Sequence, residues 1–275
     1  MTIVFDLDEA TYHSATDSLS ASAAKILLGT RPPESQAALE FGRLAHAVLL
    51  EPDKAAKDYI CLDAAAIGVK ADGTPAQVPT MTAAWKRAVA AAEQAGQTVV
   101  ATEDWQRAND MADAVRKHKR ASELLAECPQ REVSAYAEIE PGVMVRGRFD
   151  LLGPGSAADY KTALDGDPEG FGRIAAKYGY YIQAAVYRFL AHANGIDIDA
   201  LRFILCEKDP TPGGNYRVSV TRLDDMYVAK GLEDFKEAVR RWLALERRVD
   251  LPDYPDEEVL VPMPDWLISD DEMVI

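Results

Sequence analysis

Residues 143–162 read VMVRGRFDLLGPGSAADYKT, two strand-like runs joined by a Gly-Pro-Gly turn. The first run carries Asp150, and the second carries Asp159 with Lys161 two positions further on. Because side chains alternate between the two faces of a strand, Asp159 and Lys161 share one face. A hairpin-like connection can bring Asp150 close to Asp159. We therefore expect two carboxylates and one ammonium group to converge at the edge of a sheet.

Such a group suits a magnesium-dependent hydrolase. Mg²⁺ is a hard cation that binds through a few carboxylates, water and substrate phosphate. A bound metal lowers the pKa of its water, and a neighbouring lysine can orient that water or stabilise the charge of the transition state. Aspartate is common where strands turn, however, and D-x-K alone occurs by chance in many proteins. The interpretation therefore needs support from other parts of the chain.

The hydrophobic pattern around this stretch predicts a mixed α/β (α+β) fold. Upstream, it predicts helices at 20–29, 34–50, 81–96 and 103–126, a short strand at 58–62 and a loop at 63–79. Downstream, it predicts strands at 132–139, 143–152, 156–161, 200–207 and 216–222, and helices at 168–193 and 223–247. We expect a single domain over 1–275, with a mostly helical N-terminal part (1–130), a core (131–248) and an acidic, Pro-rich tail (249–275).

Two further sets of polar residues lie on predicted helices. His46 follows Gly42 by four residues in a helix otherwise rich in Ala and Leu, where a histidine packed at the edge of the core would be ordinary. Gln183 and Tyr187 are spaced i, i+4 and share one helix face, where a polar pair packed on the sheet would be equally ordinary. Each set alone is a weak signal, but their order along the chain is specific.

In order, the motifs are G-x-x-x-H, G-x-x-D, D-x-K and Q-x-x-x-Y. This set resembles the PD-(D/E)xK nuclease superfamily, and most closely its RecE-type exonuclease VIII branch, which is related to the RecB nuclease domain. The resemblance covers most of the chain. It is carried by YHS at 12–14, SLS at 18–20, GRLAHAVLLEP at 42–52, GRFDLL at 147–152, DYKT at 159–162, YYIQAAVY at 180–187 and MPDW at 263–266.

The resemblance implies a restriction-endonuclease-like fold, with a mixed central sheet flanked by helices and an N-terminal helical region. It also implies a role for each matching residue. Its metal ligands would be His46, Asp150, Asp159 and the backbone carbonyl of Tyr160, holding Mg²⁺, for which Mn²⁺ can substitute. Lys161 would position the attacking water. Gln183 and Tyr187 would support the site or contact the DNA backbone. In relatives, an acid sometimes lies on the strand before GRFD, and the pattern leaves Glu132 and Glu138 as alternatives.

The same resemblance implies an exonuclease that digests duplex DNA ends, processively and 5′→3′, leaving 5′-phosphates. Such enzymes act in phage or prophage recombination with a single-strand annealing protein of the RecT type, and a homo-oligomer would fit that role. A single-strand or structure-specific endonuclease on the same fold is the alternative enzyme. A degenerate nuclease fold that only binds DNA ends is the alternative without catalysis.

Composition restricts these readings. The three cysteines, Cys61, Cys128 and Cys206, lie far apart, which excludes the cysteine set of an iron–sulfur cluster found in some relatives. No apolar run approaches the roughly 20 residues that span a bilayer, and the N-terminus does not resemble a signal peptide, so we expect a cytoplasmic protein that does not bind membranes. The net charge of −15 is unusual for a DNA-binding protein, but nine of the 45 acids lie in 249–275, which has no Lys or Arg.

Overall fold

The computed structural model describes residues 2–5, 7–30, 35–70, 72–249 and 256–263. Within these residues, one mixed sheet has the strand order β1-β5-β6-β7-β8-β9, with β2 paired to β6. β7 and β8 are parallel, whereas β5-β6 and β8-β9 are antiparallel. The mixed central sheet predicted for the core is therefore confirmed. Its strands are β1 (Thr2–Val4), β2 (Ser18–Ser20), β5 (Gln130–Glu140), β6 (Val143–Leu152), β7 (Ala157–Ala163), β8 (Leu201–Glu207) and β9 (Val218–Arg222).

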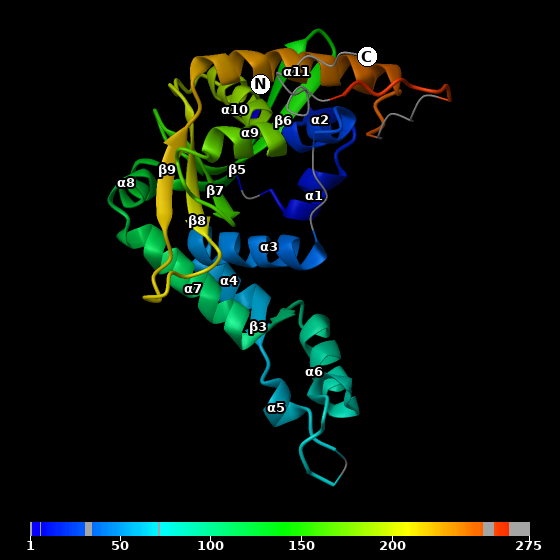
Figure 1. Cartoon of the computed structure of the whole chain (residues 1–275), viewed down its shortest axis with the longest axis vertical. Coiled ribbons are helices and arrows are strands. Elements are labelled where there is room, and N and C mark those ends of the chain that lie inside the picture. Colours follow the sequence, from blue (N-terminus) through cyan, green and yellow to red (C-terminus); the bar gives the residue numbers. More distant parts are fainter. Residues whose placement is uncertain (1, 6, 31–34, 71, 250–255, 264–275) are drawn as a thin grey trace, which may run out of the picture.

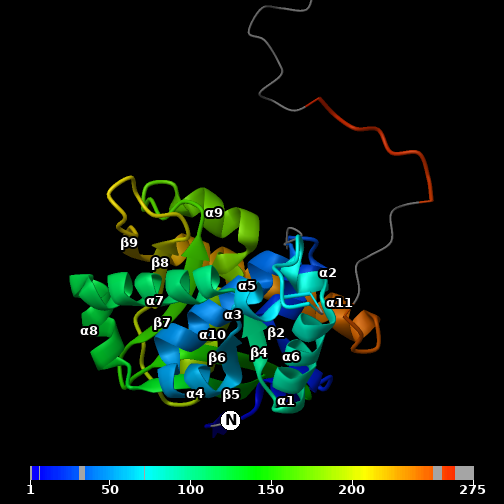
Figure 2. The same ribbon diagram turned by 90° about the horizontal axis from the view of Figure 1, so that it is seen from below.

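Helices flank the sheet and form a separate apolar core on each face. One core is contributed by α2 (Ala21–Leu27), α9 (Phe171–Tyr178), α10 (Tyr180–Ala193) and α11 (Asp225–Ala244), together with strand residues such as Phe149 and Phe203. The other is contributed by α3 (Gln36–Leu50), α4 (Pro52–Asp58), α7 (Thr102–Lys117) and α8 (Lys119–Glu127), together with Leu151 and Tyr160. Figure 2 shows α3 and α7 side by side.

Two helices predicted as continuous are broken. The helix predicted at 103–126 divides at His118, whose backbone is extended and whose ring caps α8 by accepting from the Ala121 N–H. The helix predicted at 168–193 begins only at Phe171 and divides at Gly179, which has a left-handed backbone (φ 64°). A Cβ on Gly179 would also lie 2.6 Å from Cδ of Lys25. Apolar periodicity on both sides of each break conceals it from a pattern-based prediction.

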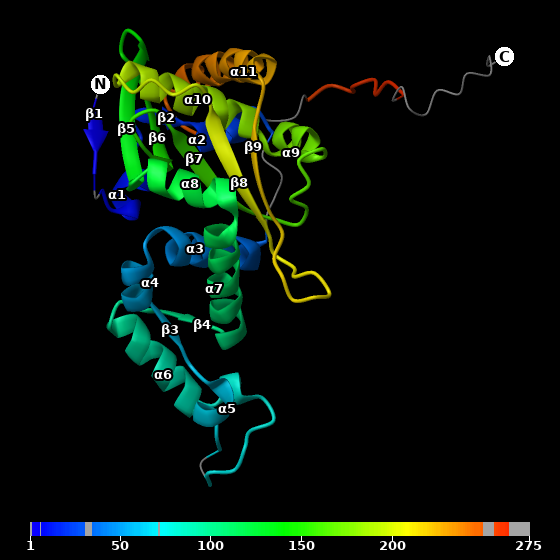
Figure 3. The ribbon, with the colours of Figure 1, turned by 90° about the vertical axis from the view of Figure 1, so that its left-hand side faces the viewer.

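The N-terminal part also contains elements that the pattern missed. β1, β2 and α1 (Glu9–Ser14) precede the first predicted helix, and β1 and β2 join the main sheet. The predicted strand at 58–62 is β3 (Tyr59–Cys61), but it pairs in parallel with an unpredicted strand, β4 (Thr98–Val100). Between them, the predicted loop holds α5 (Ala64–Ile67) and a 3₁₀ turn (Pro79–Met81), followed by α6 (Ala83–Gln94). Figures 1 and 3 show this part projecting away from the main sheet.

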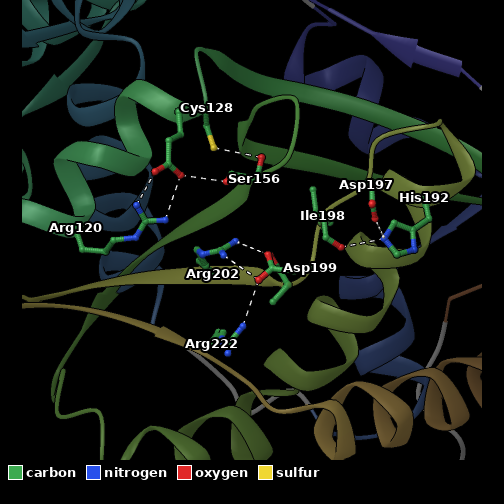
Figure 4. A network of polar contacts seen from close by, with 11 residues as sticks. Arg120, Cys128, Ser156, His192, Asp197, Ile198, Asp199, Arg202 and Arg222 are labelled. Atoms are coloured by element: carbon green, nitrogen blue, oxygen red, sulfur yellow. Dashed lines mark hydrogen bonds and ion pairs between the residues drawn. The ribbon is translucent and has the colours of Figure 1, made fainter.

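A polar network stabilises the amino-terminal ends of β7 and β8 (Figure 4). Arg120 contacts Glu127 at 2.6 Å, and Glu127 accepts from the hydroxyl of Ser156, which directly precedes β7. Asp199 binds both Arg202 and Arg222 close to the start of β8. These contacts fix the amino ends of the two parallel strands, whereas Asp159 and Lys161 lie in the middle of β7.

The predicted acidic tail lies mostly outside the described residues, since 250–255 and 264–275 are not among them. The MPDW motif at 263–266 is therefore described only at Met263. Among the described helices, none is long and apolar enough to cross a bilayer.

Candidate active site

Asp150 and Asp159 lie opposite each other at the point where β6 and β7 separate. These strands pair at two positions, Leu151 with Ala158 and Leu152 with Ala157. One further step in this antiparallel register places Asp150 across from Asp159. The backbone N–H of Tyr160 then donates to Oδ2 of Asp150 at 2.8 Å, which ties that carboxylate to β7. The convergence predicted from the sequence is present, and it arises from the register of a short strand pair.

Glu132 extends this row of acids onto β5. The register pairs Arg131 with Leu151 and Val133 with Phe149, so that Glu132 stands opposite Asp150. The backbone of Glu132 is left-handed (φ 51°), a conformation that costs a non-glycine residue about 1–3 kcal/mol and that is concentrated at functional sites.

Of the two acids that the sequence left as alternatives, only Glu132 lies beside Asp150. Its carboxylate accepts from Nε of Arg148 at 2.8 Å. Glu138 is exposed and instead accepts from the backbone N–H of Gly142, in the turn between β5 and β6. Arg148 was not predicted as a site residue, although it lies inside the GRFD motif and its partner could have been sought among the acids of the preceding strand.

His46 reaches the acids from α3, on the opposite side of the cleft. Its Nδ1 lies 3.5 Å from Oδ2 of Asp150, and its ring packs against Tyr160 with 5.1 Å between ring centroids. One side-chain ligand atom each from His46, Glu132 and Asp150 lie within 4.8 Å of one another, close enough for the three to hold one metal ion. Three elements that are distant in sequence therefore supply one nitrogen and two oxygen donors.

Asp159 is held by two other partners. Its Oδ2 lies 2.5 Å from Nζ of Lys161, and its Oδ1 accepts from Nε2 of Gln183 at 2.5 Å. Gln183 is buried on α10, so the helix fixes the orientation of this carboxylate. A carboxylate offers about four lone pairs, so these two contacts leave Asp159 able to accept further partners.

Tyr187, one helical turn after Gln183, binds β6 rather than an acid. Its hydroxyl donates to the backbone carbonyl of Arg148 at 2.8 Å, immediately before Phe149 and Asp150. This contact requires α10 to approach β6 closely at Gly147, where a Cβ would lie 2.6 Å from Cδ1 of Leu190 and 2.9 Å from Cε1 of Tyr187. The glycine of the GRFD motif is therefore needed for packing.

All seven predicted site residues surround or adjoin one cleft of about 730 Å³. Six of them line it, together with Glu132 and Arg148: His46, Asp150, Asp159, Lys161, Gln183 and Tyr187. Tyr160 is fully buried, and its backbone contacts Asp150. The same cleft extends along α3, past Gly42 and Arg43, to the base of the projecting β3-β4 part.

The electrostatics of the site favour a cation between the acids. Burial raises the pKa of Glu132 to about 7, and the charge of Asp150 adds to that rise. Burial and then Asp159 raise the pKa of Asp150 well above its ordinary value. Burial and Lys161 lower the pKa of His46, so its imidazole is neutral at pH 7. Neutral imidazole and carboxylates that repel each other are groups that a divalent cation stabilises.

Lys161 keeps its charge in this setting. Burial opposes the ammonium form, but the nearby Asp159 carboxylate outweighs that effect and raises the pKa of Lys161. Its Nζ also lies 5.2 Å from the centroid of the Tyr180 ring, a favourable position for a cation. A permanently charged donor therefore stands beside the acids.

A family model described as a PDDEXK-like domain of unknown function matches residues 11–258. The chain belongs to this PDDEXK-like family. The match includes every residue of the cluster described above, and the central mixed sheet flanked by helices is the fold of that family. No curated protein matches the chain.

Three solved structures resemble the chain. A “putative exonuclease” from Eubacterium rectale has a TM-score of 0.56 and 16% identity, over 95% of this chain and 97% of that one. An alkaline exonuclease from Laribacter hongkongensis has a TM-score of 0.36 and 11% identity, over 86% of this chain and 94% of that one. A complex of the latter enzyme with dAMP has a TM-score of 0.29 and 15% identity, over 60% and 83%. At such identities, the first likeness supports the fold, and the other two are too distant for argument.

Proposed function

We propose that this chain is a divalent-metal-dependent deoxyribonuclease that hydrolyses phosphodiester bonds at duplex DNA ends. The observation that carries the proposal is the cluster of His46, Glu132 and Asp150, with Lys161 held beside it by Asp159. Membership of the PDDEXK-like family and the name of the Eubacterium rectale protein support it. Mg²⁺ is the expected metal because the donors beside His46 are the carboxylates of Glu132, Asp150 and Asp159.

The donor set fits one hard cation. His46, Glu132 and Asp150 would hold it, and the remaining lone pairs of Asp159 and the Tyr160 carbonyl would complete the set that the family resemblance implies. Such a metal lowers the pKa of its water and neutralises charge on the scissile phosphate. Lys161 would then orient the attacking water, since its ammonium is fixed at 2.5 Å from Asp159 and donates three hydrogen bonds.

The remaining residues would keep these groups in place. Gln183 holds the Asp159 carboxylate through Oδ1, which leaves Oδ2 towards Lys161. Tyr187 anchors the β6 backbone just before Asp150, and Arg148 holds Glu132. A misplacement of about 1 Å can cost roughly 100-fold in rate, so each of these contacts should influence turnover more than metal binding.

Linear duplex DNA with Mg²⁺ or Mn²⁺ tests the activity. We expect cleavage by the wild-type chain and its loss in Asp159→Ala and Lys161→Ala, and full activity in either variant would refute the assignment. A covalently closed circle separates the two nuclease alternatives, because an enzyme that needs an end leaves it intact. Polarity, a single-strand annealing partner and a homo-oligomer stay predictions of the family resemblance.

Calorimetry with Mn²⁺ tests the metal site independently of turnover. Glu132→Gln should weaken Mn²⁺ binding at least tenfold, because it removes one of three clustered donors. Glu138→Gln is the matched control, since the same change lies on the same strand but outside the cleft. If the two variants bind Mn²⁺ equally well, Glu132 is not a ligand. If wild type binds no metal, the alternative of a DNA-end-binding module gains support.

A further inference from the structure

Thr162 and Lys208 lie together at the carboxyl ends of the parallel strands β7 and β8. The register pairs Thr162 with Cys206, so Lys208, two residues later, falls on the same face as Thr162. The backbone N–H of Lys208 donates to the carbonyl of Ala163 at 2.8 Å, which continues the strand pairing beyond β8. Both side chains line the active-site cleft. The carboxyl ends of parallel strands are a common place for ligands to bind.

The ammonium of Lys208 has no carboxylate partner within the part of the chain that the structure describes, and the Thr162 hydroxyl makes no hydrogen bond there. Other basic side chains of the cleft do have acidic partners. Each of the following contacts Glu9, Glu51, Glu132, Asp150 or Asp159: His13, Arg43, His46, Lys54, Arg148 and Lys161. Lys208 is thus a cation of the cleft whose charge is not already matched by a carboxylate.

The nearest carboxylate in the sequence, Glu207, is engaged elsewhere. It is buried, accepts from the backbone N–H of Gly166 at 3.0 Å, and pairs with Arg217. Through Glu207, the end of β8 is thus tied to Gly166 in the segment after β7 and to Arg217 just before β9. The backbone beneath the two side chains is therefore held in place before any ligand arrives, which lowers the entropic cost of binding.

A chain with a net charge of −15 repels a polyanion, so a cleft cation without a carboxylate partner, such as Lys208, marks where phosphate can lie. Thr162 directly follows Lys161 on β7, and although the two side chains leave opposite faces of the strand, both residues line the same cleft. Building on the proposed nuclease function, we propose that Thr162 and Lys208 bind the backbone phosphate next to the scissile one on the cleaved strand. The lysine supplies charge, and the hydroxyl donates a hydrogen bond to a phosphate oxygen.

Salt dependence of DNA binding tests this site without relying on turnover. Fluorescence anisotropy would be measured with labelled duplex DNA in chelator, so that no cleavage occurs. One lost lysine–phosphate contact reduces the slope of log K against log salt by about 0.7–0.9. We expect this change in Lys208→Ala, restoration of the slope in Lys208→Arg, and an unchanged slope in Lys236→Ala, an exposed lysine on α11 outside the cleft. Thr162→Val should weaken binding without altering the slope.

A scan with neutral phosphates locates the contact. A set of duplexes would each carry one methylphosphonate at successive positions around the mapped cleavage site. Wild type should lose affinity when the phosphate next to the scissile one is neutral, and Lys208→Ala should be insensitive at that position alone. An unchanged slope in Lys208→Ala, or equal sensitivity of both proteins at every position, would overturn the proposal. If wild type neither binds nor cuts DNA, it is the proposed nuclease function that fails.

Discussion

Gly42 offers a test of the idea that α3 keeps its cleft face clear for substrate. It lies inside the helix, one turn before His46 and so on the same face, and it lines the cleft. A Cβ built on it meets no atom within 4 Å, and its backbone does not need glycine, since its φ is not positive. Packing and backbone conformation therefore do not explain why glycine occupies this position.

Gly42→Ala should make the protein more stable. Glycine in a helix interior is less favourable than alanine by about 0.8–1.0 kcal/mol. With no clash to offset that gain, the free energy of unfolding should rise by about 0.8–1.0 kcal/mol, and Tm by about 2–4 °C for a chain of this size. Thermal and urea unfolding measure both quantities. A lower Tm would show that the space beside Gly42 is already filled.

Gly42→Leu separates stability from function. Leucine is also a good helix former, but its side chain would extend from α3 into the cleft beside His46. We expect a folded protein with a normal melting curve and a DNA cleavage rate at least tenfold lower at subsaturating substrate. Glu40→Leu, on the exposed side of the same helix and outside the cleft lining, is the control for the added leucine. Wild-type cleavage by Gly42→Leu would refute the reasoning.

Two other predictions concern packing and pH. Gly147→Ala should lower the free energy of unfolding by about 1–3 kcal/mol in urea, because its Cβ would lie 2.6 Å from Leu190. Gly155→Ala is the control and should change stability little, since its Cβ would lie 3.8 Å from the nearest neighbour. Equal effects of the two substitutions would contradict this account. Since the folded pKa of Glu132 is about 7, above its ordinary value of 4.5, the metal-free protein retains a proton that the unfolded chain releases. Its free energy of unfolding should therefore fall by up to about 3 kcal/mol between pH 4.5 and 7. Measurements of Tm against pH in chelator test this, and the fall should be smaller in Glu132→Gln.

The convergence of Asp150, Asp159 and Lys161 could be predicted from the sequence because it depends on local structure. Asp150 and Asp159 are joined by a short turn, so the strand pattern alone brings them together, and alternation fixes the face of Lys161. The helical spacing of Gln183 and Tyr187 correctly put both on one face, although they bind different partners, Asp159 and Arg148.

The choice between Glu132 and Glu138 needed the structure. Glu132 and Glu138 are separated by an even number of positions on β5, so their side chains would share one face of a regular strand. The register of β5 and β6 decides between them, because Glu132 stands opposite Asp150 whereas Glu138 pairs with Met144, close to the turn. The breaks at His118 and Gly179 are local, since the His118 ring caps α8 and Gly179 ends α9 in a left-handed conformation. The short strands β1 and β2 form only because β5 and β6 provide edges for them.

The separation of the site residues along the chain also affects synthesis. His46 belongs to an early helix, whereas Gln183 lies on the crossover between the parallel strands β7 and β8. At about 5–20 residues per second, roughly 7–27 s pass between translation of these two residues. During that interval, the nascent chain cannot hold Asp159 as the finished protein does. On the proposed nuclease function, activity would therefore begin only after α10 has been synthesised and has packed beside β7.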